Sequence, residues 1–316
     1  MCSLVRNEFR LCNFGLNFLH PEYFGISQWR WPRPVYLTYR LVMAGYTLFA
    51  LIYTLAEVET DNSSDVASAE PAFNPMVFLT NWSYLVLTFH FFIAFVVAVV
   101  CYIRDRASTK PQPTSENAPP RHVGESPTIS NHDKGIESHE DIAVKSDNEM
   151  GSGGPKPESK SPDLSETQDL NTTPWYSKIS WILANITSDT CIIVTSIYFA
   201  ALYDPSSGMT LSNLNVHGLN TVFVIVDTFI SARPVRILHF IYTLIYAVAY
   251  IIFSLIYWAT DRAIIYKNIL DWSTPGSTVG ILIGISVLVF LLQFIYFGLY
   301  QLRLYIYRKV YGKESR

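Results

Sequence analysis

Polar side chains recur at helical spacing in an otherwise apolar stretch near the middle of the chain. The intervals between them are 4, 3, 4, 3 and 4 residues, so they share one face of an α-helix, and five of the six are polar. The six positions are Asn213, His217, Asn220, Val224, Asp227 and Ser231. The imidazole of His217 is the member suited to act as a general base, because it titrates near neutrality.

A second stripe follows the same rule in residues 76–103, where Thr80, Ser83, Leu87, His90 and Ala94 are spaced by 3, 4, 3 and 4 residues. In the topology predicted from the Lys and Arg distribution, both spans begin at the outer surface. Thr80 lies about four residues inside its predicted span and His217 about three residues inside its own, so both are about one helical turn below that surface. A hydroxyl and an imidazole at one depth could form a nucleophile–base pair. The structural alternative is that the Thr80 hydroxyl bonds a carbonyl of its own helix or a neighbouring helix.

Neighbouring polar residues are candidates for supporting that pair. Asn213 and Asn220 are near enough to His217 to orient its ring or to donate to an oxyanion, and Ser83 shares the face of Thr80. Asp227 is the most remote supporting candidate, because it lies ten residues beyond His217, ~15 Å along a helix axis.

Asp227 also has a purely structural interpretation. Arg40 is predicted near the inner end of the first span, at a depth where an ion pair with Asp227 would neutralise both charges. His90, near the middle of its span, is expected to be a hydrogen-bond partner between helices rather than a ligand.

Six apolar segments must position these residues. Only 16% of the 316 residues are charged, against about 25% in soluble domains, and each segment reaches the ~18–20 residues that cross a bilayer. Backbone groups in lipid have no partner outside the chain, so the spans must be helical. The prediction is an all-α membrane protein, a bundle of about six transmembrane helices in contact with the lipid bilayer. The spans are Val35–Ala56, Met76–Ile103, Ile179–Leu202, Leu214–Ser231, Ile237–Ala259 and Val279–Leu302.

Composition divides the rest of the chain. Residues 1–34 form an N-terminal segment, either interfacial or a loose tail, and 35–103 hold the first two helices. Residues 104–174 form a loop without aromatic residues from Ala107 to Pro174, which predicts disorder. Residues 175–305 hold helices three to six, and 306–316 form a basic tail.

Lys and Arg concentrate on alternate sides of these spans. Segments 1–34, 232–236 and 303–316 are basic, and the 104–174 loop opens with Arg104, Arg106 and Lys110. The 57–75 and 203–213 loops contain no Lys or Arg, and the 260–278 loop is mixed. The positive-inside rule therefore predicts that both termini and the long loop are cytoplasmic, N-in and C-in.

Several function classes lose support. The net charge of −3 offers no field for nucleic acid. The four cysteines contain no CxxC pair and the histidines are scattered, so we expect no metal and no cofactor. A transporter or channel is disfavoured, because there is neither a ring of charges nor a pair of helices interrupted by Gly and Pro.

Three stretches resemble the rolling stone family of animal membrane proteins. They are SQWRWPRPVYLTYRLVMAGY, NWSYLVLTFHFF and HGLNTVFVIVD, and the resemblance covers nearly all of the chain except the 107–174 loop. It implies a multi-pass protein of the plasma membrane, with the endoplasmic reticulum as the alternative. It also implies a role in cell–cell (myoblast) fusion, with membrane-protein partners.

A more distant resemblance is to the androgen-induced family of membrane threonine hydrolases, which cleave fatty acid esters of hydroxy fatty acids. FLTNWSYL is similar to that family's threonine motif and NVHGLNTV to its histidine motif. The resemblance implies that Thr80 is the nucleophile, His217 the base and a lipid ester the substrate. A fusion protein and a lipid-ester hydrolase therefore remain alternative interpretations.

Overall fold

The computed structural model describes residues 6–64, 74–108, 172–267 and 269–312, and this part of the chain is helical, with two isolated β-bridges and no strand. Five helical stretches are long and apolar enough to cross a membrane, and they coincide with five of the predicted spans. They are Arg33–Glu57 in α2 (Arg33–Ser64), α3 (Leu79–Ser108), α5 (Trp175–Ile197) continued by η4 (Tyr198–Leu202), η7 (Ile237–His239) continued by α8 (Phe240–Asp261), and α9 (Pro275–Tyr311). The predicted all-α membrane fold is confirmed.

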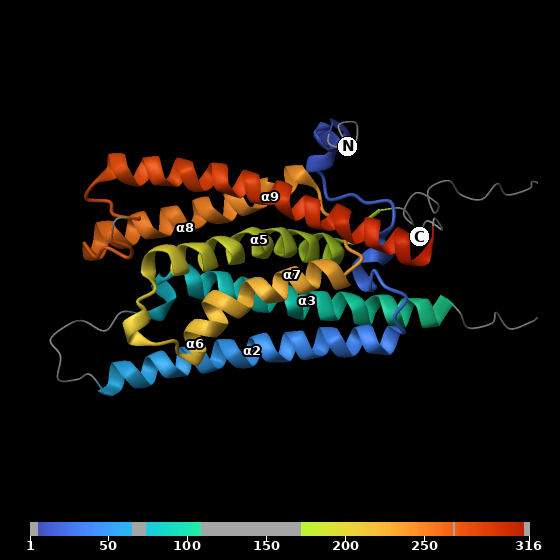
Figure 1. Ribbon diagram of the computed structural model, residues 1–316, viewed down its shortest axis with the longest axis horizontal. Helices are drawn as coiled ribbons and strands as arrows, with labels where there is room; N and C mark the ends of the chain where they lie inside the picture. The colour runs from blue at the N-terminus through green and yellow to red at the C-terminus, as the bar shows by residue number, and fades with distance from the viewer. Residues whose placement is uncertain (1–5, 65–73, 109–171, 268, 313–316) are drawn as a thin grey trace, which may run out of the picture.

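The predicted span Leu214–Ser231 takes a different form. It is helical over α6 (Leu211–Leu214), η6 (Asn215–Leu219) and α7 (Asn220–Ile230), and η6 is a π-helical turn. It is not among the five apolar stretches, because its polar stripe lowers its hydropathy. It nevertheless lies lengthwise in the bundle beside α5 (Figure 1). A total of six spans stays a prediction.

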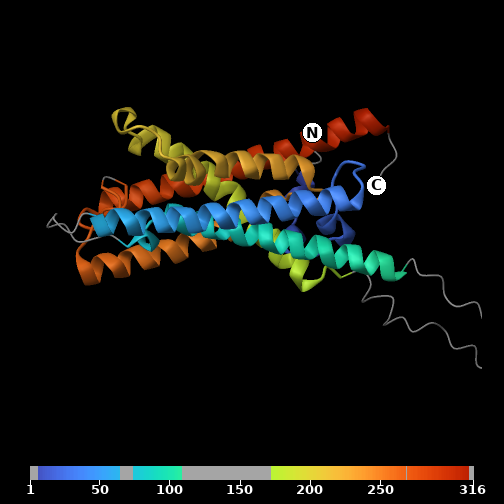
Figure 2. The same cartoon turned by 90° about the horizontal axis from the view of Figure 1, so that it is seen from below.

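Helix α5 lies at the centre of the bundle, in contact with α3, α7, α8 and α9, while α2 packs on the far side of α3 (Figures 1 and 2). The buried face of α5 carries small residues at intervals of three or four, namely Ser177, Ser180, Ala184 and Ser188. Small side chains let helix backbones approach closely in a membrane, where no hydrophobic force drives helices together. This composition explains the central position of α5.

One end of the bundle, called here the N/C end, gathers both chain termini, the last turn of α3 and the first turn of α5 (Figure 1). The N-terminal segment packs there through η1 (Leu11–Phe14) and η2 (Pro21–Gly25), and Phe24 is buried against Val97 and Trp181. Ser27 pairs with Ser231 just after α7. Most of the predicted disordered loop, residues 109–171, lies outside the described residues.

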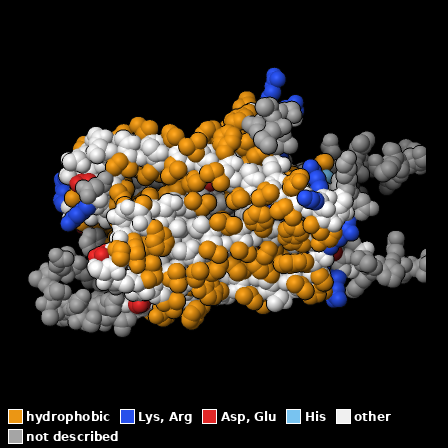
Figure 3. Space-filling model, in the orientation of Figure 1, with side chains coloured by type: hydrophobic (Ala, Val, Ile, Leu, Met, Phe, Trp, Pro, Cys, Tyr) orange, Lys and Arg blue, Asp and Glu red, His pale blue; other side chains and the backbone are white. Residues whose placement is uncertain are grey.

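The opposite end is predicted to be outside the cell and is called here the outer end. It contains η3 (Pro75–Val77), η5 (Pro205–Ser207) and the connection from α8 to α9. Between the two ends, apolar side chains cover the surface in a broad belt with few charges (Figure 3). Exposed members of this belt include Phe49, Phe92, Ile252 and Ile283, as expected for helices that face lipid.

Candidate functional site

A partly enclosed cavity runs from the outer end toward the middle of the bundle, between α3, α5, η6, α8, α9 and the α8–α9 connection. The cavity has a volume of about 110 Å³ and is open at its mouth, so its enclosed part is smaller than the ~300–1,000 Å³ of typical small-molecule pockets. Aliphatic and tyrosine side chains dominate the lining. Leu202 and Ser286, which line it, are exposed on helices that face lipid, so the cavity communicates with the surface of the belt.

Thr80 and His217 both line this cavity. They are 137 positions apart in the chain, and they come together because η6 packs against both α3 and α5. The structure therefore brings to one apolar space the two residues that the depth argument paired.

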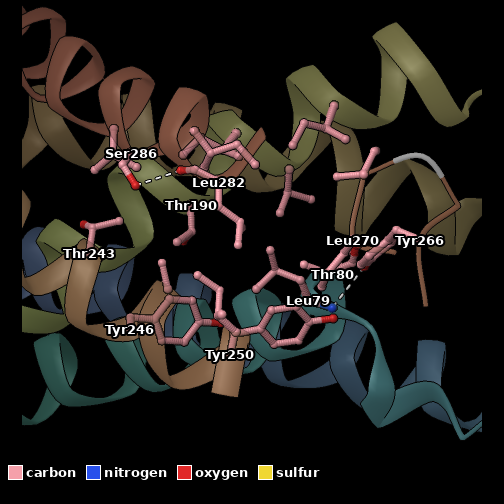
Figure 4. A pocket seen from close by; sticks show the side chains of 18 of the residues that line it. Leu79, Thr80, Thr190, Thr243, Tyr246, Tyr250, Tyr266, Leu270, Leu282 and Ser286 are labelled. Atoms are coloured by element: carbon pink, nitrogen blue, oxygen red, sulfur yellow. Dashed lines mark hydrogen bonds between the residues drawn. The ribbon is translucent and has the colours of Figure 1, made fainter. Parts of the chain in front are cut away.

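Thr80 is the second residue of α3 and is half-buried. The backbone N–H of Leu79, the first residue of the helix, donates to the hydroxyl of Tyr266 at 3.0 Å, and Thr80 lies beside the same hydroxyl (Figure 4). The first turn of a helix has N–H groups without intrahelical acceptors. Tyr266 supplies one acceptor and so fixes the turn that carries Thr80.

His217 lies in one of two π-helical turns that face each other. It is the third residue of η6, and its ring stacks on that of Tyr198, the first residue of η4, with 3.7 Å between ring centroids and an interplanar angle of 4°. The Nδ1 atom of His217 is buried and has no hydrogen-bond partner among the described residues. Single π turns are frequent at functional sites, and this pair places an imidazole with an unpartnered nitrogen in the cavity lining.

Asn220 supports the π turn rather than the ring of His217. Its side-chain amide donates to the carbonyl of Val216 at 2.7 Å, and its Oδ1 accepts from Thr195 on α5 at 3.0 Å. Asn213 is half-buried and does not line the cavity, whereas Asn215 is buried and accepts from the hydroxyl of Tyr46 at 2.6 Å. A π turn inserts one extra residue, and this changes which side chain of the preceding turn faces inward.

Ser83 and Asp227 lie outside the cavity lining. Ser83 is buried on the face of α3 and neighbours the hydroxyl of Tyr246, which does line the cavity. Asp227 lies toward the N/C end, where its Oδ1 accepts from Arg40 at 2.5 Å and its Oδ2 from Arg233 at 3.0 Å. The predicted ion pair between Arg40 and Asp227 is confirmed.

His90 completes that buried cluster, with 3.2 Å between its Nε2 and Oδ2 of Asp227. The predicted role of His90 as a hydrogen-bond partner between helices is therefore confirmed. All four side chains of the cluster are at most 5% exposed, so removal of the carboxylate would leave two arginines buried without a counter-charge. The cluster ties α2, α3 and α7 together.

Tyr198 and Tyr266 are the two site residues that the sequence did not single out. Tyr198 lies in a run of apolar and aromatic residues at the end of a predicted span, and Tyr266 in a predicted outer loop. The sequence indicates Tyr266 only as an aromatic residue in a short connection that contains both basic and acidic residues. Among the described residues no group of three or more His, Cys, Asp and Glu side chains is placed to hold a metal ion.

The chain is similar to one family of known proteins. Residues 161–313 match the family model described as Protein rolling stone. Protein rolling stone of Drosophila melanogaster is 24% identical over 312 residues, which cover 96% of this chain and 90% of that protein. No solved structure matches the chain significantly. The resemblance drawn from the three sequence stretches is confirmed.

Proposed function

This chain is a membrane protein of the rolling stone type, and we propose that it is an intramembrane hydrolase of fatty-acyl esters. One observation carries the proposal: Thr80 and His217, the two residues with nucleophile and base chemistry, line the same apolar cavity. A cavity of mostly apolar lining with a few convergent polar groups is the usual form of a small-molecule site. In this proposal an acyl chain lies along the apolar wall and extends through the open mouth toward lipid, and water enters from the outer end.

The proposed reaction is acyl transfer through Thr80. The Oγ of Thr80 attacks the ester carbonyl carbon while His217 accepts the Thr80 proton. The C–O bond to the alcohol then breaks, and the alcohol leaves with that proton. A water molecule attacks the acyl-Thr80 carbonyl, His217 again takes a proton, and Thr80 regains it as the fatty acid leaves. The sum is ester plus water giving acid plus alcohol.

The test is covalent labelling in membranes by a fluorophosphonate probe with a long alkyl chain. We expect wild-type protein to be labelled at Thr80 and Thr80→Ala protein to be unlabelled. Thr190→Ala is the matched control, because Thr190 lines the same cavity while its hydroxyl donates to the carbonyl of Ile186 at 2.7 Å. Equal labelling of Thr80→Ala and wild type, or no labelling of wild type, contradicts the proposal.

The family also supports a second role, in cell–cell fusion such as that of myoblasts, at the plasma membrane. The predicted outer loops are short, spanning residues 57–75, 203–213 and 260–278. Direct bridging of two cells requires more reach, so we propose that the protein acts indirectly, through membrane lipid composition or a membrane-protein partner. Surface biotinylation tests the plasma-membrane location, and retention in the endoplasmic reticulum contradicts it. Rescue of fusion by Thr80→Ala protein would separate the fusion role from hydrolysis.

A further inference from the structure

The α8–α9 connection folds back over the mouth of the cavity. Its backbone bridges Tyr266 to Leu270, and the Leu270 N–H donates to the Tyr266 carbonyl at 2.9 Å. Ile265 and Leu270 are the buried apolar residues of this connection. The ring of Tyr266 packs edge-on against Phe78, with centroids 6.0 Å apart. Tyr266 is thus held in place by its backbone and by its ring.

Four of the eight hydroxyl groups that line the cavity already donate to acceptors within the protein. Thr190 donates to the carbonyl of Ile186, Tyr250 to that of Val77 at 2.8 Å, and Ser286 to that of Leu282 at 2.8 Å. Thr243 donates to Oδ2 of Asp189 at 2.8 Å. These four protons are therefore not available to a bound substrate.

The hydroxyl of Tyr266 differs from these four, because it accepts from the Leu79 N–H and lies in hydrogen-bonding contact with the hydroxyls of Thr80 and Tyr250, so that its proton can turn toward a ligand beside Thr80. Thr80 is immediately beside it (Figure 4). Burial raises the pKa of Tyr266, although hydrogen bonding around Thr80 and Leu79 opposes the shift. The group therefore remains a protonated donor at neutral pH.

A tetrahedral intermediate at Thr80 needs such a donor. The negative charge develops on the former carbonyl oxygen, within hydrogen-bonding distance of groups that surround the nucleophile. The N-terminus of α3 lies at the same place, and the helix dipole there favours negative charge. Tyr266 is the fixed side-chain hydroxyl at this position.

We infer, on the basis of the proposed hydrolysis, that Tyr266 is a third catalytic residue, whose hydroxyl donates a hydrogen bond to the substrate's carbonyl oxygen as that oxygen becomes an oxyanion. The proton stays on Tyr266 throughout, so the transfers between Thr80, His217, the alcohol and water are unchanged. This role assigns to the α8–α9 connection a part in catalysis as well as in closing the cavity.

The test compares Tyr266→Phe with the matched control Tyr242→Phe, with p-nitrophenyl palmitate as substrate. Each change removes one tyrosine hydroxyl and keeps the ring. Tyr242 lies outside the cavity lining, and its hydroxyl donates to the carbonyl of Phe14 at 2.9 Å. We expect Tyr266→Phe to lower kcat by about 100-fold or more, with KM little changed and with the acidic limb of the pH profile, which His217 sets, at the same midpoint. We expect Tyr242→Phe to keep kcat near the wild-type value.

Two different failures can be told apart. Wild-type turnover together with undiminished kcat for Tyr266→Phe overturns the role of Tyr266 alone. Equal losses of kcat in Tyr266→Phe and Tyr242→Phe, with matching losses of thermal stability, also overturn it in favour of a packing role. Absence of wild-type turnover removes the hydrolase proposal and this inference with it.

Discussion

The rings of Tyr198 and His217 lie parallel, 3.7 Å apart between centroids, and each ring belongs to a π-helical turn. The stack joins the outer end of α5 to the helix that carries the polar stripe. Because Tyr198 covers one face of the His217 ring, the stack restricts rotation of that ring. The correct orientation of a general base contributes to catalysis as much as a suitable pKa does.

The stack predicts a graded response at position 198. Tyr198→Leu should lower kcat for ester hydrolysis by roughly tenfold, the upper end of the ~0.5–1.5 kcal/mol that an aromatic pair contributes. Tyr198→Phe keeps the stacked ring and should keep kcat near the wild-type value. Both variants are measured with the same ester and in a thermal unfolding assay in detergent. A larger loss in Tyr198→Phe than in Tyr198→Leu would show that the hydroxyl matters and the stack does not.

The buried cluster around Asp227 predicts a large effect on stability without direct involvement in chemistry. Asp227→Asn removes the charge that Arg40 and Arg233 share, and we expect a loss of about 3–5 kcal/mol in unfolding free energy. The control is Asp105→Asn, since Asp105 pairs with Arg33 at the exposed N/C end and such pairs contribute about 1 kcal/mol or less. Comparable losses in the two variants would contradict the account of the cluster.

Some parts of this structure follow from sequence alone. Apolar length locates the spans, and the shared depth of Thr80 and His217 agrees with their position in the lining of one cavity. The pairing of Arg40 with Asp227 also follows, since a buried charge needs a counter-charge. These inferences rest on local composition and on regular helical spacing.

Other parts do not follow from sequence. The 4, 3, 4 spacing around residue 217 predicts an unbroken α-helix, yet a π turn interrupts it and turns Asn215 inward instead of Asn213. No residue type specifies a π turn. The position of Tyr266 depends on how a loop folds back over another helix, and helical periodicity carries no information on that contact.

Orientation in the membrane is tested by accessibility. The Lys and Arg distribution predicts that the long loop is cytoplasmic. An epitope inserted after Glu140 should therefore bind antibody only after cells are permeabilised. Staining of intact cells would reverse the orientation and move the cavity mouth to the cytoplasmic side.

The same loop should be dispensable for folding. Its lack of aromatic residues predicts no packed core, so deletion of residues 110–170 should leave insertion and thermal stability in detergent nearly unchanged. The deletion stops short of Thr173, because the N–H of Phe18 donates to the Thr173 hydroxyl at 2.7 Å. A large loss of stability in the deletion variant would reveal a folded contact.

At Thr173 itself, the substitution Thr173→Val should destabilise the N-terminal segment, by about 1 kcal/mol.

The central claim is that Thr80 and His217 act as one nucleophile–base unit in the cavity. The most direct measurement is kcat for hydrolysis of a long-chain p-nitrophenyl ester by purified wild type, Thr80→Ala, His217→Ala and the double variant. The effects of substitutions within such a unit are not additive, so each single substitution should lower kcat about as much as the double substitution does. Expression and thermal stability should be retained. Residual activity that falls in two independent steps, or full activity of Thr80→Ala protein, would contradict the claim.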